Sequence, residues 1–328
     1  MRQVTLDEWI GKERKIITNE KKTKVPETKR WQHWKEALSL IRDYQEIRIP
    51  KKKGGYRTIS IPPEKLKKTQ REILRFLRRM FGTWHLQIHG LYRGSYVEHA
   101  KIHSQSRFIF QFDIKDAFPS VNVFKLKQVL RREILWENIV NNENEAEELA
   151  FLLINLTTFN ETLPQGAPTS PFLFYIYIME MDLIGQLYRC CPLGQRMEIS
   201  CYVDGIVVSG QKPIPPDIRE RMIKTVEKEG LMVNEKKIWH KDCRNGNIMI
   251  TGLSIDGKGK ISLPKKKIRK WRGIIHRAAL ETDPCAKTDL GLKIEGFIAS
   301  LKPIYGEKLP PQIEKPYQTF KAKINPPH

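Results

Sequence analysis

Two apolar, β-prone stretches that each carry an aspartate constrain the fold of this chain more than any other feature. The segment RFIFQFDI, residues 107–114, has the aromatic and β-branched residues of a buried strand, and Asp113 stands near its end. Residues 197–209 predict two short strands around Asp204-Gly205, because an Asp-Gly pair between apolar runs is typical of a type I′ hairpin turn. A carboxylate among buried residues is costly unless it is neutralised, so a cation is the natural partner of both acids.

Two carboxylates brought together from remote positions can hold a pair of magnesium ions about 3.5–4 Å apart. Such a pair activates an attacking hydroxyl and stabilises a leaving pyrophosphate. On these two residues alone, a simpler interpretation remains open, in which Asp204 favours the turn and Asp113 caps a strand end. The segments around them decide between the two interpretations.

Periodicity and turn residues predict several helices and hairpins along the chain. Residues 47–63, IRIPKKKGGYRTISIPP, predict a hairpin with a basic loop. Apolar residues at helical spacing predict an amphipathic helix with a basic face over residues 66–80. Further helices are expected over residues 124–135, 145–158 and 172–188.

The charge of the chain points to nucleic acid. There are 58 Lys and Arg residues against 37 Asp and Glu, a formal net charge of +21, and the basic residues recur along the chain. Residues 258–277 hold nine basic residues and no acid, which predicts a small helical domain with a basic face. An anionic membrane surface would attract the same charge, so charge alone leaves that partner open.

Other compositional features limit the class of protein. No stretch of about 18 apolar residues occurs, and the N-terminus lacks a signal-peptide pattern. The five cysteines include no CxxC pair, so neither a zinc site nor a disulfide framework is indicated. We therefore expect a cytoplasmic protein that does not associate with membranes.

The ordered motifs resemble those of the reverse transcriptase domain, and their residue sequences are most similar to those of bacterial retron reverse transcriptases. IPKKKGGYRTISIPP resembles the fingers hairpin, FDIKDAFPSVN the first catalytic-acid motif and LPQGAPTSP the proline-glycine motif. CYVDG is similar to the second catalytic-acid motif, GLMVNEKKI to the lysine-bearing motif and ITGLSI to the strand of the primer grip. The resemblance covers about residues 30–300.

The resemblance implies an α+β fold of the right-hand polymerase type, with an antiparallel palm sheet packed on helices. The domains implied are an N-terminal basic extension over residues 1–30, fingers and palm over 31–256, and a small helical thumb with a C-terminal tail over 257–328.

The assignment to the retron type depends on two short sequence motifs. The run from His99 to His103 resembles the family's Asn-Ala-x-x-His element with His in the first place, and Ile250-Thr251-Gly252 resembles its Val-Thr-Gly element. Both elements contribute, within the family, to recognition of its own structured RNA. His99 and His103 at i,i+4 spacing are also compatible with metal ligands or ordinary surface residues.

The resemblance also implies a catalytic centre. Asp113 and Asp204 would bind two Mg²⁺ ions, or Mn²⁺ in their place, with the backbone carbonyl of Ile114 as a further ligand. Lys237 would donate a proton to pyrophosphate. Lys236 competes for that role, and Lys237 as a plain surface lysine is the remaining alternative.

Nucleotide and RNA contacts follow by position. Phe118 would lie under the sugar and exclude a 2′-hydroxyl, unless it is a core residue. Arg57 and one of residues 51–53, taken as Lys53, would hold the triphosphate, while Gln165 and Gly166 pack near the nucleotide. Trp271 either stacks on a base or packs in the thumb core. The residues expected to follow RNA or an RNA–DNA hybrid are Lys265, Lys266, Lys267, Arg269, Lys270 and Arg272.

One position departs from the family pattern. Family members normally carry two aspartates at the turn, and Gly205 replaces the second here. The replacement removes a negative charge from a site that must neutralise two divalent cations, and such losses cost about 10–100-fold in metal affinity or activity. Glycine also suits a type I′ turn better than aspartate, so folding alone gives no sign of lost function.

The resemblance therefore implies an RNA-directed DNA polymerase that uses dNTPs to copy a structured non-coding RNA, serving as template and primer, into msDNA. An antiviral defence role with an effector protein accompanies that expectation. Two alternatives stay open: a catalytically weakened polymerase, and an RNA-binding relative of maturase-like or defence-associated type that no longer polymerises.

Overall fold

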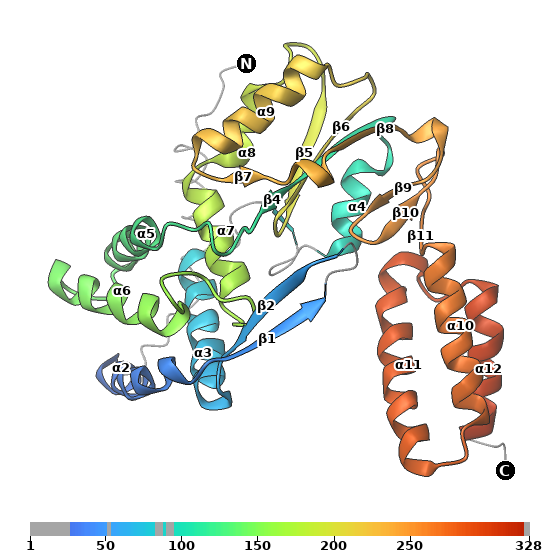
Figure 1. The fold of residues 1–328 in the computed structure, drawn as a ribbon, viewed down its shortest axis with the longest axis horizontal. Coiled ribbons are helices and arrows are strands. Elements are labelled where there is room, and N and C mark those ends of the chain that lie inside the picture. Colours follow the sequence, from blue (N-terminus) through green and yellow to red (C-terminus); the bar gives the residue numbers. More distant parts are fainter. Residues whose placement is uncertain (1–26, 51–53, 83–87, 90–94, 325–328) are drawn as a thin grey trace. The chain divides into compact units, whose positions relative to one another are not determined.

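The computed structural model describes residues 27–50, 54–82, 88–89 and 95–324 (Figure 1). Most of the predicted basic extension over residues 1–30 lies outside these ranges. The chain divides into two compact units, each assembled from three stretches. The first unit takes residues 1–93, 114–186 and 225–233, and the second takes residues 94–113, 187–224 and 234–328. Neither unit is a contiguous range, and the predicted domain boundaries at residues 30 and 256 stay a prediction.

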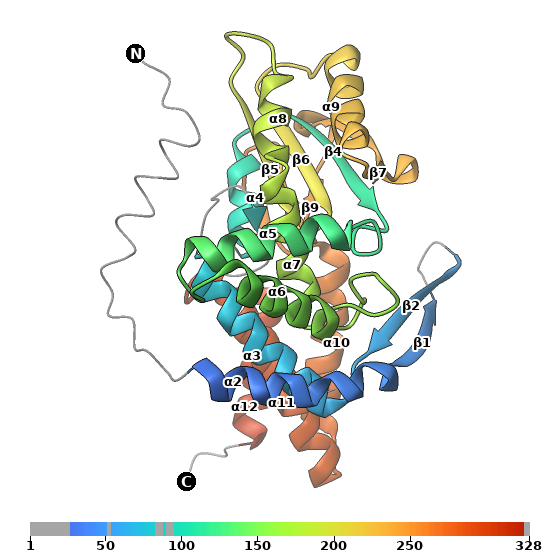
Figure 2. The same cartoon turned by 90° about the vertical axis from the view of Figure 1, so that its left-hand side faces the viewer.

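Helices make up most of the first unit. They are α2 (Glu27–Glu36), α3 (Glu64–Phe81), α5 (Val123–Trp136), α6 (Glu143–Thr157) and α7 (Ser170–Glu180). The amphipathic pattern of α3 is confirmed, since Leu66, Ile73 and Leu77 are buried and the basic residues between them mostly face solvent. Asn122 and Asn142 cap α5 and α6 by accepting hydrogen bonds from backbone amides of the first turn. Figure 2 shows α5, α6 and α2 stacked in that order.

A 3₁₀ turn (Ala37–Asp43) leads from α2 into the predicted hairpin of β1 (Gln45–Pro50) and β2 (Tyr56–Ile61), which pair antiparallel. Tyr44 anchors the base of this hairpin by stacking on Phe159, with ring centroids 4.5 Å apart. Its hydroxyl accepts a hydrogen bond from Gln70 Nε2 at 2.8 Å. Burial raises the pKa of Tyr44 to about 12, although the Gln70 bond works in the opposite direction.

An antiparallel sheet lies at the centre of the second unit. Its strands are β4 (Phe108–Lys115), β5 (Met197–Tyr202), β6 (Gly205–Gly210) and β8 (Trp239–Asp242). β4 pairs with β6 on one side and with β8 on the other, and β5 pairs with the far edge of β6. The last two residues of β4 belong to the first unit, where they pair with β7 (Met232–Val233). Helix α4 (Tyr96–Ser104) packs on β5 and β6.

The same unit contains a three-stranded sheet and a helical bundle. The strands are β9 (Ile248–Ile250), β10 (Leu253–Ile255) and β11 (Ile261–Ser262), and the helices are α10 (Lys265–Leu280), α11 (Pro284–Tyr305) and α12 (Pro311–Ile324). One apolar core joins these elements to α4, β4 and β6. Trp271 stacks on Phe297 with ring centroids 3.9 Å apart, which confirms the thumb-core interpretation of this tryptophan. The α+β fold is likewise confirmed.

The prediction of one long helix over residues 172–188 is wrong. The chain forms α7 and then α8 (Leu183–Arg189), with Asp182 at a φ of +49° between them. The Asp182 carboxylate occupies the space next to Gly185, where a Cβ atom would clash with Oδ1. Glycine at position 185 therefore lets the acid sit over the first turn of α8. Two further elements are the short strand β3 (Ile88–His89) and helix α9 (Pro216–Lys228).

Hydropathy gives a separate result. Within the described ranges, no helix combines the length and apolar character needed to cross a membrane.

Candidate functional site

The loop that carries Asp204 begins one residue earlier in the chain than predicted. β5 ends at Tyr202 and β6 begins at Gly205, so Val203 and Asp204 form the two-residue loop. Val203 has a φ of +57°, whereas neither Asp204 nor Gly205 has a positive φ. The predicted type I′ turn centred on Asp204-Gly205 is therefore wrong. A β-branched residue in the left-handed region is a local source of strain, as is common in functional loops.

Gly205 is an extended strand residue and is not required by the turn. It pairs with Tyr202 on one side and with Asp113 on the other. A Cβ atom at position 205 would lie 3.6 Å from Asp113 Oδ1 and 3.6 Å from the Tyr202 carbonyl oxygen, which is ordinary van der Waals contact. The expectation that glycine suits this position for conformational reasons is also wrong. Because directly paired residues point to the same face, a side chain here would lie beside the Asp113 carboxylate.

Asp113 already has a cation beside it. Its carboxylate is 14% exposed, and Lys237 Nζ lies 2.5 Å from Oδ2. Lys237 ends a 3₁₀ turn (Glu235–Lys237), which is held to β4 because the Asn234 amide donates to the Asp113 carbonyl at 2.8 Å. Of the two lysines considered from the sequence, the structure brings Lys237 to the acid.

Both acids influence the buried thiol of Cys201 in β5. Burial raises the pKa of the Cys201 thiol, and the Asp204 and Asp113 carboxylates raise it further. Negative charge thus concentrates around the end of this hairpin, and the Lys237 ammonium occupies a position that suits a cation.

The residues fit a divalent metal ion. Carboxylate and carbonyl oxygens are the ligands that Mg²⁺ and Mn²⁺ prefer, and Asp113 and Asp204 supply the former. Ile114, whose carbonyl is the third expected ligand, follows Asp113 directly in β4. In the described part of the chain, no group of three or more His, Cys, Asp or Glu side chains converges, so the donor set is small. The metal-ligand alternative for His99 and His103 gains no support.

The residues that were predicted to contact the nucleotide, where the structure describes them, lie in the first unit. The Ser60 amide of β2 donates to the Gln165 carbonyl at 3.0 Å, which joins the proline-glycine loop to the hairpin. Gly166 has a φ of +145°, and a Cβ atom there would lie 2.5 Å from the Ser60 carbonyl oxygen, so this close approach requires glycine.

Arg57 and Phe118 also lie in this unit. Arg57 is exposed on β2, and Phe118 is half-buried with its ring 5.9 Å from that of Phe174 in an edge-to-face contact. Lys53 lies outside the described residues. The nucleotide-binding roles of all these residues stay predictions.

The two retron motifs lie in the second unit, and a hydrogen bond joins the second motif to α4, the helix that carries the first. His99 and His103 are 1% and 0% exposed, so their rings are inside the protein and any role in RNA recognition would be indirect. Thr251 and Gly252 form the turn between β9 and β10, both with positive φ. The Thr251 hydroxyl donates to the Tyr96 carbonyl of α4 at 2.8 Å.

The basic residues expected to contact RNA are on the surface. All six are exposed along α10, namely Lys265, Lys266, Lys267, Arg269, Lys270 and Arg272. Their RNA contacts stay a prediction.

Two serines within the hairpin of β5 and β6 were not predicted from the sequence. Ser200 and Ser209 are fully buried, one on each strand, and both bond His103. The available signal was a hydroxyl in each of two otherwise apolar strands, because a buried polar group requires a partner.

Comparison with known proteins identifies the family. The sequence profile of reverse transcriptase (RNA-dependent DNA polymerase) matches residues 49–250, more than half of the chain and a span that contains both acids and Lys237. This chain belongs to the reverse transcriptase family. Members of this family generally use divalent metal ions, in agreement with the oxygen ligands described above.

Curated relatives are retron reverse transcriptases. The chain is 28% identical to the retron Mx162 reverse transcriptase of Myxococcus xanthus, over 75% of this chain and 55% of the relative. It is 27% identical to the retron Ec73 reverse transcriptase of Escherichia coli, over 78% of this chain and 81% of the relative. The chain thus spans about half the length of the first relative. The predicted resemblance to retron reverse transcriptases is confirmed.

A solved structure of apo telomerase from Candida tropicalis, truncated from its C-terminal domain, is a distant structural neighbour. Its TM-score is 0.46 at 13% identity, over 67% of this chain and 55% of that chain. The likeness is too low to indicate a shared function.

Proposed function

We propose that this chain is an RNA-directed DNA polymerase of the retron type, which copies a structured non-coding RNA into DNA. The observation that carries the proposal is the juxtaposition of Asp113, Lys237 and the Asp204 loop at one end of an antiparallel sheet. That arrangement lies within the span matched by the reverse transcriptase profile.

Asp113, Asp204 and the Ile114 carbonyl would hold two Mg²⁺ ions, with Mn²⁺ as the alternative. When bound, the ions activate the primer hydroxyl and neutralise the leaving pyrophosphate. Lys237 would donate a proton to the pyrophosphate. Its Nζ lies 2.5 Å from Asp113 Oδ2, which supports a role for this ammonium beside the acid that would hold the metal.

The other sequence-derived residues complete the proposal. Arg57 and Lys53 would bind the dNTP triphosphate, Phe118 would exclude ribonucleotides, and Gln165 with Gly166 would support the nucleotide. The exposed basic face of α10 would follow the RNA–DNA hybrid, since A-form helices are bound through backbone and shape. The structured RNA would serve as template and primer. An effector protein, a role in antiviral defence and a cytoplasmic location belong to the same proposal.

The test is DNA synthesis by the purified protein with its copurified RNA. Labelled dNTPs are supplied in Mg²⁺ or Mn²⁺, and we expect DNA whose sequence is complementary to the RNA. Asp204→Asn keeps the shape of the side chain and removes its charge, and we expect it to lower the rate at least about 100-fold.

A second candidate function is an RNA-binding protein that does not polymerise. Gly205 is the observation that favours it, because the metal site has one carboxylate fewer than is usual in the family. Absence of DNA synthesis in both metals, by the wild-type chain and by Gly205→Asp, together with retained RNA binding, would support this candidate instead.

A further inference from the structure

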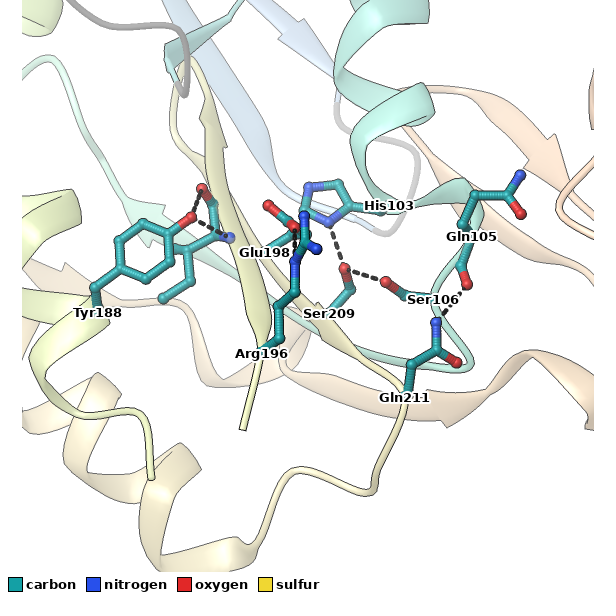
Figure 3. A network of polar contacts seen from close by, with 9 residues as sticks. His103, Gln105, Ser106, Tyr188, Arg196, Glu198, Ser209 and Gln211 are labelled. Atoms are coloured by element: carbon teal, nitrogen blue, oxygen red, sulfur yellow. Dashed lines mark hydrogen bonds and ion pairs between the residues drawn. The ribbon is translucent and has the colours of Figure 1, made fainter. Parts of the chain in front are cut away.

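One buried histidine joins the two strands that carry the Asp204 loop. His103 is 0% exposed, its Nδ1 lies 2.8 Å from Ser209 Oγ and its Nε2 lies 2.6 Å from Ser200 Oγ. Ser200 is in β5 and Ser209 is in β6. Figure 3 shows the ring of His103 with its contact to Ser209 and the onward contact to Ser106. The imidazole therefore cross-links the hairpin from the side of α4.

The hydrogen bonds are mutually consistent. The Ser209 hydroxyl donates to Ser106 Oγ at 2.9 Å, so Ser209 can accept from Nδ1–H of His103. Nε2 is then the acceptor for the Ser200 hydroxyl. A neutral imidazole thus satisfies both hydroxyls. In a buried network of this kind, removing one member leaves the others without partners, and the whole network is weakened.

The cross-link lies on the same face of the sheet as the first acid. Ser209 pairs with Ile109 of β4, and Gly205 pairs with Asp113 four residues further along the same two strands. Directly paired residues share a face, and residues two or four apart on a strand do so too. The hydroxyl of Ser209 and the carboxylate of Asp113 therefore project to one side of the sheet.

The opposite end of α4 is also fixed. A capping box formed by Ser95 and Glu98 closes its first turn, and the Tyr96 hydroxyl donates to the Ser300 carbonyl of α11 at 2.9 Å. The Tyr96 carbonyl accepts from Thr251 at 2.8 Å. Helix α4 is thus held at both ends within the second unit, and these contacts fix the position of His103.

We propose that His103 is a positioning residue, which holds β5 and β6 in the geometry that lets Asp204 bind metal together with Asp113. The strained loop at Val203 needs such support, because a two-residue connection transmits any shift of either strand directly to Asp204. This inference rests on the proposed function. The inference assigns the motif from His99 to His103 a role in the metal site in place of direct contact with RNA.

The test compares variants by the affinity of RNA-free protein for Mn²⁺, measured by electron paramagnetic resonance. His103→Leu removes the ring nitrogens, and the double change Ser200→Ala with Ser209→Ala removes the hydroxyls. We expect each to weaken Mn²⁺ binding by about 10–100-fold, as changes behind metal ligands do. In DNA synthesis we expect a lower kcat with the KM for dNTP nearly unchanged. His103→Gln retains a donor and an acceptor and should recover part of both effects.

A matched control separates positioning from general destabilisation. Thr157 is fully buried in α6, and its hydroxyl donates to the Leu153 carbonyl at 2.7 Å. Thr157→Ala should lower the thermal unfolding midpoint without changing Mn²⁺ affinity. If His103→Leu does not fold, the serine double variant decides, because it deletes only two oxygen atoms.

The outcomes are distinct. Unchanged Mn²⁺ affinity and kcat in the serine double variant would overturn the inference, and so would loss of RNA binding alone in His103→Leu. A wild-type chain that binds no Mn²⁺ would overturn it as well. A wild-type chain that binds Mn²⁺ but makes no DNA would defeat the proposed function only, because the comparison of Mn²⁺ affinities needs no polymerisation.

Discussion

Gly205 is the residue at which the sequence departs from the family pattern, and the structure shows whether the backbone requires glycine there. The position is extended, pairs with Asp113 and has room for a Cβ atom. Neither backbone conformation nor crowding therefore requires glycine here. The missing carboxylate is therefore a chemical difference that the backbone at this position does not impose.

We expect Gly205→Asp to tighten Mn²⁺ or Mg²⁺ binding by about 10–100-fold and to raise the rate of DNA synthesis, because it restores a carboxylate beside Asp113. Gly205→Ala is the matched control. It adds the Cβ atom without charge and should stabilise the chain by about 0.5–1 kcal/mol while leaving metal affinity unchanged. Titration with Mn²⁺ and urea unfolding measure the two effects. Equal metal affinity in the Ala and Asp variants would contradict this account.

The candidate acids could be predicted from the sequence, because Asp113 and Asp204 each stand beside an apolar strand. The exact loop could not, since the pairing of Gly205 with Asp113 of a distant strand decides where the turn falls, and local residue preference favoured Asp204-Gly205. The burial of His103 was also hidden, because its serine partners are about 100 residues away along the chain.

At the scale of elements, the hairpin of β1 and β2 depends on how its base is anchored. Tyr44 stacks on Phe159, and its partner Gln70 also donates to the Leu156 carbonyl at 2.9 Å. One side chain of α3 thus connects the hairpin to the end of α6. The neutral phenol suits this buried position, whereas a phenolate does not.

The anchor predicts a loss of stability at alkaline pH. The pKa of Tyr44 is about 12 in the folded chain against about 10 when unfolded, so its contribution is complete below pH 10 and declines as pH rises toward 12. Two pKa units correspond to at most about 2.7 kcal/mol. Tyr44→Phe should lose the Gln70 bond at every pH but show a smaller decline between pH 9 and 12 in urea unfolding. Parallel curves for the two proteins would contradict this assignment.

Strongly periodic elements such as α3 and the hairpin could be predicted, because their apolar residues alone determine which face is buried. The division between α7 and α8 could not. The break lies at Asp182, which has a φ of +49° and whose carboxylate lies over Gly185, and that arrangement has no periodic signature.

At the scale of the whole molecule, the net charge of +21 acts at long range, whereas a nucleic-acid interface needs cations on one face. Lys266, Arg269 and Lys270 have i, i+3 and i+4 spacing and share a face of α10. Exposed lysines elsewhere in the same helical bundle, Lys302, Lys308 and Lys315, carry equal charge in other positions.

Replacing those three α10 residues by Gln should weaken RNA binding and lower the slope of log K against log salt concentration by about 2–3, close to one for each phosphate that is no longer neutralised. Replacing Lys302, Lys308 and Lys315 by Gln changes the net charge equally and should alter the slope little. Filter binding at several salt concentrations measures both. Equal slopes in the two triple variants would mean that net charge, and not the face of α10, governs binding.

The charge and the order of motifs made the molecular class predictable, but the division into units was not. Each unit combines three separate stretches, so no composition change along the chain marks its limits. Contacts between residues far apart in sequence define such units, and a single sequence records them only indirectly.

The room for a Cβ atom at position 205 has a genetic consequence. Wherever the glycine codon ends in a pyrimidine, one transition at its second base converts it to an aspartate codon. Because the new Cβ atom meets only ordinary van der Waals contacts, no neighbouring atom has to move to admit it. A single mutational step would therefore supply the family's paired aspartates, and selection for faster DNA synthesis should recover that change before others.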